Sequence, residues 1–133
     1  MKNRSARNSE SGVVTAFVIG LMMTFVVCAG LGFDGGRLIA RRIEIADLAE
    51  NAARIGAQEL TDLRSGEPKV DEIQARISAL NYLAPFDVNG EIFTSSESVT
   101  VKVGTELEMT LLKIFGASSH EISVTRRAEP RDK

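Results

Sequence analysis

The chain has 133 residues, with 16 Lys and Arg against 18 Asp and Glu and a formal net charge of −2 at pH 7. This near balance gives no reason to expect a nucleic acid or another acidic polymer as partner. Because Cys28 is the single cysteine and His120 the single histidine, one copy has neither an internal disulfide nor a metal site built from several Cys or His ligands. We predict no metal and no cofactor.

The strongest signal is an uncharged apolar run over residues 13–33. As a helix it would be roughly 31 Å long, which matches the hydrocarbon core of a bilayer. We therefore predict a polar tail over residues 1–12 and a transmembrane helix over 13–33. Val27 before Cys28 argues against a lipoprotein signal. A cleaved secretory signal is the alternative, but the run is longer than a typical signal core.

The sequence contains less evidence for the orientation of this helix in the membrane than for its position in the chain. The basic residues are equal in number on the two flanks, Lys2, Arg4 and Arg7 before the run and Arg37, Arg41 and Arg42 after it. The positive-inside rule is therefore tied. The short tail and the signal-like layout predict a cytoplasmic N-terminus and an extracytoplasmic C-terminal domain.

A membrane-exit motif, Asp34, Gly35, Gly36 and Arg37, follows the run. We interpret Asp34 as an interfacial carboxylate, and the alternatives are a pair with Arg37 or a contact with a neighbouring subunit. Apolar residues then recur every three or four positions, which predicts a stalk helix over residues 34–64. The sequence Ser-Gly-Glu-Pro at 65–68 is a typical helix stop.

Small residues recur along this predicted helix and include a GxxxG pair. Such residues let another helix approach closely, which in a membrane favours association. The alternative is that the outer part packs on the protein's own head. The predicted helix-packing interface consists of Gly32, Gly36, Ala46, Ala49, Ala53 and Gly56.

Residues 65–133 are predicted to form a small α+β head. A helix over 70–83 carries an apolar stripe of Ile73, Ile77 and Leu80. Alternating valines predict a strand over 99–103, and weaker patterns predict strands over 88–93 and 122–125. A turn at 95–97 would join the first two strands, and residues 126–133 would form a frayed tail.

The segment 107–116 is apolar and ambiguous. Its pattern fits a short helix and a strand extension equally well. It either completes the core or forms a patch that faces a partner.

No catalytic constellation is predicted. Ser119, His120 and Glu121 are neighbours along a predicted strand, so their side chains alternate between its faces and do not converge. Glu106 and Glu108 lie beside an apolar run rather than a cleft, and the glycines do not form a phosphate loop. We therefore predict that the chain is not an enzyme.

Several segments in this order resemble the TadE/TadG-like proteins of Tad (tight adherence, Flp) pilus assembly, in the short type found in actinobacteria. They are residues 11–15, the apolar run with Gly-Phe-Asp-Gly-Gly-Arg at 32–37, and Ala-Asp-Leu-Ala-Glu-Asn-Ala-Ala at 46–53 followed by Gly56-Ala57. The later valine strand, Phe115-Gly116 and the closing strand also resemble that family.

The resemblance implies a minor pilin or pseudopilin, with a pilin-like stalk helix and a small head of one helix and about three antiparallel strands. Its partners would be the membrane, other pilin-like subunits and the pilus assembly machinery, with homo-oligomers as a further option. Prepilin peptidase substrates carry Glu at the fifth position after the cleaved glycine, but counting from Gly12 that position is Phe17. We therefore expect no such processing.

The predicted function is a non-enzymatic structural or assembly subunit of a Tad-type pilus or a related secretion apparatus. The alternative is a membrane-tethered binding or sensing module that acts alone.

Overall fold

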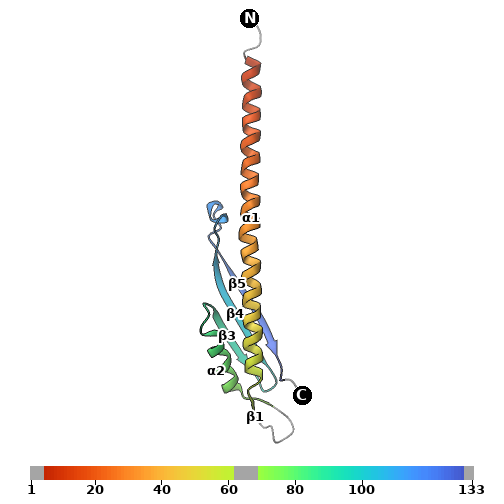
Figure 1. Ribbon diagram of the computed structural model, residues 1–133, viewed down its shortest axis with the longest axis vertical. Helices are drawn as coiled ribbons and strands as arrows, with labels where there is room; N and C mark the ends of the chain where they lie inside the picture. Colours follow the sequence, from red (N-terminus) through yellow and green to blue (C-terminus); the bar gives the residue numbers. More distant parts are fainter. Residues whose placement is uncertain (1–4, 62–68, 131–133) are drawn as a thin grey trace. The chain divides into compact units, whose positions relative to one another are not determined.

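The computed structural model describes residues 5–61 and 69–130, and in the first helix it describes side chains from residue 12 onward. The fold class is α+β, as predicted. The elements are α1 (Ser5–Ala57), β1 (Leu60–Thr61), β2 (Lys69–Val70), α2 (Glu72–Leu83), β3 (Asn89–Thr94), β4 (Val99–Glu108), the 3-10 turn η1 (Leu112–Phe115) and β5 (Ser119–Ala128) (Figure 1).

The chain divides into two compact units, which we describe separately. One comprises the chain up to Arg37 together with Met109–Ser118, and the other comprises Leu38–Glu108 together with the chain from Ser119 onward. The predicted boundary between a stalk at 34–64 and a head at 65–133 does not coincide with these units, because α1 contributes residues to both.

Helix α1 contains the apolar run and passes through the membrane-exit motif without a break. From Gly12 onward it is long and apolar enough to cross a membrane. Large apolar side chains of the run, such as Phe17 and Phe25, are exposed in the isolated chain. One apolar N-terminal helix of this kind is consistent with a single-pass membrane protein.

The prediction that the helix continues to about residue 64 is wrong at its end. The N–H groups of Gln58 and Glu59 donate to carbonyls only three residues back, at 3.2 and 3.1 Å, so the helix tightens and stops. Leu60–Thr61 then pairs in antiparallel fashion with Lys69–Val70. The segment after α1 therefore pairs as a strand instead of continuing the helix. The predicted stop at 65–68 lies outside the described residues.

Helix α2 begins at a side-chain cap. The carboxylate of Asp71 accepts hydrogen bonds from the N–H groups of Ile73 and Gln74, both at 3.1 Å. This is the usual way to satisfy the free donors of a first helical turn. The helix ends at Leu83, as the following Pro85 predicts.

The apolar stripe predicted for α2 is wrong. Its buried residues are Ala75, Ala79 and Leu83, whereas Ile73, Ile77 and Leu80 are 72%, 45% and 43% exposed. Both sets recur at helical spacing, and the sequence pattern followed the larger side chains. The buried face is the one that meets α1 and the sheet: the carbonyl oxygen of Ala75 lies close to Gly56 of α1, and Leu83 lies against Gly90 of β3.

Strands β3, β4 and β5 form an antiparallel sheet in that order. Alternate residues of β4 point inward, which confirms the period-two pattern at 99–103. The predicted turn between β3 and β4 is also present, because the N–H of Ser95 donates to the carbonyl of Ser98 at 2.9 Å. The predicted frayed tail is partly wrong, since Arg126 and Arg127 extend β5 by pairing with β4.

The core of the second unit lies between the outer part of α1, α2 and one face of the sheet (Figure 1). Helix α1 contributes mainly alanines, which bring it near the sheet. The fully buried residues include Ile45, Ala49, Ala52, Ala53, Ala75, Ala79, Val99, Val101 and Val103.

Candidate functional site: an aspartate that holds the β4–β5 loop

Asp34 is the most unusual polar residue of the first unit, because its side chain is only 1% exposed. Its Oδ1 accepts the N–H of Thr110 at 3.0 Å, and its Oδ2 accepts those of Leu111 and Leu112 at 2.8 and 2.7 Å. The donors are consecutive and belong to the loop between β4 and β5. A carboxylate of α1 therefore holds this loop by its backbone.

The electrostatics of the site favour the charged carboxylate. The N–H of Leu112 lowers the pKa of Asp34 most, burial opposes it, and the N–H groups of Thr110 and Leu111 and the charge of Arg37 lower the pKa further. The net pKa lies below the ordinary value of 3.8. At neutral pH the aspartate is ionised and each of its hydrogen bonds is charge-assisted.

The loop, residues 109–118, is closed by its own backbone. The N–H of Met109 donates to the carbonyl of Ser118 at 3.0 Å. Within the loop, Gly116 ends η1 with a φ of 93°, a conformation that suits glycine. Its N–H donates to the carbonyl of Lys113 at 3.1 Å. These bonds form a compact turn that presents three successive N–H groups to Asp34.

A glycine of the apolar run makes room for this loop. Gly30 is buried, and a Cβ added to it would lie 3.4 Å from the Cβ of Leu111 and 3.5 Å from Cδ2 of Leu112. Arg37 adds a side-chain bond from its Nη1 to the hydroxyl of Thr110, at 2.5 Å. Its guanidinium also lies 6.0 Å from the ring centroid of Phe33.

Two residues of the membrane-exit motif, Asp34 and Arg37, thus bind the 109–118 loop, which the sequence did not indicate. Asp34 is not a solvated carboxylate, because it is buried and accepts three backbone hydrogen bonds, and its position at a membrane exit stays a prediction. Its partners lie 76 to 78 residues further along the chain, and no local pattern announces them. The ambiguous segment 107–116 is a strand as far as Glu108 and becomes a 3-10 turn at Leu112.

The predicted helix-packing residues separate into two groups. Gly32 and Gly36 are exposed, and a Cβ added to either would meet nothing within 4 Å. Ala49, Ala53 and Gly56 are buried within the chain's own core, and Ala46 packs partly against it. The outer half of the predicted interface is therefore corrected: these residues are covered by their own chain.

Gly56 shows how close this internal packing is. A Cβ added there would lie 3.0 Å from the carbonyl oxygen of Ala75 in α2 and 3.1 Å from Cγ1 of Val99 in β4. At Gly56 the close approach is therefore to α2 and β4 of the same chain.

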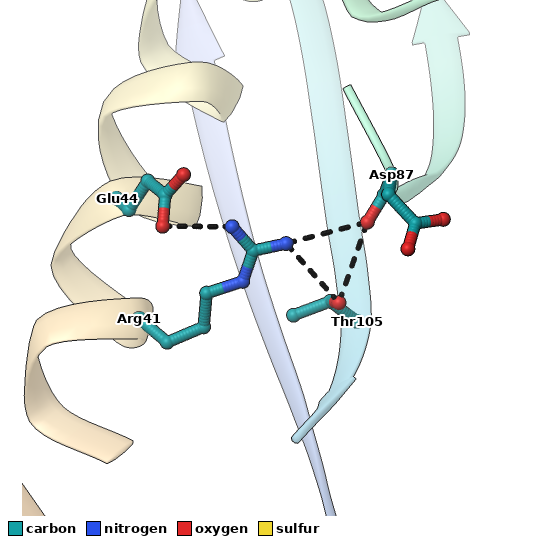
Figure 2. A network of polar contacts seen from close by, with 4 residues as sticks. All are labelled: Arg41, Glu44, Asp87 and Thr105. Atoms are coloured by element: carbon teal, nitrogen blue, oxygen red, sulfur yellow. Dashed lines mark hydrogen bonds and ion pairs between the residues drawn. The ribbon is translucent and has the colours of Figure 1, made fainter. Parts of the chain in front are cut away.

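A second polar network lies in the other unit, around Arg41 (Figure 2). Its Nη1 pairs with Glu44 at 2.7 Å, and its Nη2 donates to the carbonyl of Asp87 at 3.3 Å and the hydroxyl of Thr105 at 3.4 Å. The Arg41 side chain is 23% exposed. It connects α1 to β4 and to the segment before β3, a role that its place in a basic flank did not reveal.

The residues considered above as a catalytic group lie in succession along one strand. Ser119, His120 and Glu121 are exposed along β5, where they pair with Glu108, Leu107 and Glu106 of β4. Among the described residues, no three His, Cys, Asp or Glu side chains gather where they could hold a metal ion.

Comparison with known proteins gives one match. Residues 12–59 match the family model described as "Putative Flp pilus-assembly TadE/G-like". No curated protein and no solved structure matches the chain. The family match confirms the TadE/TadG-like resemblance over α1, from the start of the apolar run to the end of the helix. It supports a role related to pilus assembly and involvement with that machinery.

Proposed function

We propose that this chain is a non-enzymatic subunit, like a minor pilin or pseudopilin, of a Tad-type pilus or a related secretion apparatus. The observation that carries the proposal is the TadE/G-like match over residues 12–59, which covers most of α1. That helix combines an apolar half suited to a bilayer with an outer half that belongs to a folded core. A subunit with this design is retained in the membrane while its folded part contacts other proteins.

The proposed topology places residues 1–12 in the cytoplasm, residues 13–33 in the membrane and the α+β part outside the cytoplasm. This orientation agrees with a pilus-assembly role, in which subunits meet outside the membrane.

Two exposed surfaces of the chain are available for contacts with other subunits. Gly32 and Gly36 leave a smooth helical face at the end of the apolar run, where a neighbouring helix could pack closely. On α2, Ile73, Ile77 and Leu80 form an apolar stripe that the described part of the chain leaves exposed. We assign membrane-level packing to the first surface and contacts between folded parts to the second.

The experiment is affinity purification of the full tagged chain from its native membrane in mild detergent, followed by identification of the co-purifying proteins and measurement of native mass. We expect pilin-like and pilus-assembly proteins. The variant Gly36→Leu should reduce their recovery several-fold, because its side chain would hold a neighbouring helix away.

Gly20→Leu is the matched control. Gly20 also lies in the apolar run, and a Cβ added there also meets nothing within 4 Å. It lies outside the Gly32–Gly36 pair, so its substitution should leave recovery unchanged. A chain that purifies alone with the mass of a monomer would instead support the tethered binding module and contradict our proposal.

A further inference from the structure

The loop that Asp34 holds carries large apolar side chains that no part of the described chain covers. Ile114 is 75% exposed and Phe115 is 51% exposed, both within η1. Two such neighbours at the tip of a closed turn are unfavourable in water, because removing apolar surface from water stabilises a protein or its complex. The other large apolar side chains of the loop, Leu111 and Leu112, pack against α1 at Gly30.

The position of the loop along α1 indicates what covers these side chains. Leu111 and Leu112 pack at Gly30, which lies within the apolar run and three residues before its end at Phe33. At about 1.5 Å per residue, the contact is roughly 4.5 Å inside the end of the run. If the run spans the bilayer, the loop lies at the level where hydrocarbon gives way to headgroups.

We propose that η1 is a second membrane contact, in which Ile114 and Phe115 enter the bilayer interface beside α1. Leu31 and Phe33, which flank the contact at Gly30 along the helix, are also more than half exposed. Lys113, next to them in sequence, has a long side chain that reaches headgroups while its stem remains among apolar groups.

The hydrogen bonds from the loop to Asp34 hold η1 in a fixed position on α1, and so would fix the proposed membrane contact. Loop N–H groups in hydrocarbon would be costly without partners. The carboxylate satisfies those of Thr110, Leu111 and Leu112. The η1 carbonyls of Leu112 and Lys113 accept from Ala117 and Gly116. The turn therefore carries its apolar tip to the interface with much of its backbone already bonded.

The test uses tryptophan as a depth probe, since the chain contains none. The full-length Phe115→Trp variant is placed in vesicles of phosphatidylcholine and phosphatidylglycerol, with and without lipids brominated near the top of the acyl chain. We expect a blue-shifted emission that the brominated lipids quench and that aqueous acrylamide barely affects. Ile114→Asp in the same background should reduce the lipid quenching.

Two further tryptophan variants make the result decisive. Phe93→Trp is the matched control, since Phe93 is an exposed phenylalanine of β3, at 60%, and should respond to acrylamide rather than to lipid. Phe25→Trp lies near the middle of the apolar run, so it should be quenched by lipids brominated near the end of the acyl chain, and a lack of quenching there would show that α1 does not span the bilayer.

If Phe25→Trp is quenched by lipid but Phe115→Trp responds only to acrylamide, the loop lies in water and the inference is overturned. If the indole at position 115 is shielded from both quenchers, a protein surface covers the loop, which also overturns the inference while leaving the pilus-assembly proposal intact.

Discussion

Asp34 is a buried carboxylate whose hydrogen bonds all go to backbone N–H groups in one short loop. Burying a charge is unfavourable unless donors replace the lost water. Three consecutive N–H groups do so here, and the nearby guanidinium of Arg37 adds favourable charge. The aspartate therefore acts as a structural clamp, and its loss affects the 109–118 loop first.

We predict that Asp34→Asn loosens this loop. The amide nitrogen of asparagine donates rather than accepts, so it would oppose N–H groups that Oδ2 now accepts. Hydrogen exchange at Thr110, Leu111 and Leu112 should become faster in detergent-solubilised protein. Asp47→Asn is the control, because Asp47 is an exposed carboxylate of the same helix. Unchanged exchange in Asp34→Asn would contradict the clamp.

The same contact predicts a pH dependence of defined sign. Because the pKa of Asp34 is lowered in the folded state, its contribution to stability is present above the ordinary value of 3.8 and is lost as pH falls through the lower folded value. The amide shift of Leu112, followed by NMR during acidification, should report this transition. It should be missing from Asp34→Asn, and a midpoint above 3.8 would contradict the direction of the shift.

At the scale of elements, α1 carries two different surfaces. Its small residues near the membrane exit are exposed, whereas those of its outer half are buried against α2 and the sheet. Small size has two different consequences. In the core it permits close packing of the chain on itself, and near the membrane it leaves room for a neighbour.

Leucine substitutions distinguish these surfaces. Gly56→Leu should lower the free energy of unfolding by about 1–3 kcal/mol, because the side chain would overpack the contact with Ala75 and Val99. Gly36→Leu should leave stability unchanged or raise it by up to about 1 kcal/mol, since leucine is the better helix former and no atom lies nearby. Denaturant unfolding in micelles measures both. Equal effects would show that the two glycines do not differ in environment.

At the scale of the whole molecule, the decisive property is the side of the membrane on which the α+β part lies. Ser96 is exposed in the turn between β3 and β4, which makes it a suitable reporter position. The native Cys28 lies in the apolar run and is replaced by serine in the background.

We expect Ser96→Cys to react with a membrane-impermeant maleimide on intact cells, after wall permeabilisation where needed. The parent Cys28→Ser variant controls for background labelling. Reaction only after membrane lysis would place the α+β part in the cytoplasm and reverse the proposed topology.

The sequence by itself determined the features that depend on local composition and periodicity. The apolar run fixed a helix long enough for a bilayer, alternating valines fixed the central strand, and the order of short segments indicated the family. Each of these signals is contained in a few neighbouring residues. The α+β class followed from them.

Only the tertiary structure decided which faces are covered. In α2 the alanines are buried and the isoleucines are exposed. In α1, Ala49, Ala53 and Gly56 are buried within the core of the same chain. The tertiary structure also brought Asp34 to N–H groups more than 70 residues away. The physical reason is that helical periodicity defines faces without saying what packs on them. Backbone donors carry no side-chain signature, so a carboxylate that binds them is invisible in the sequence.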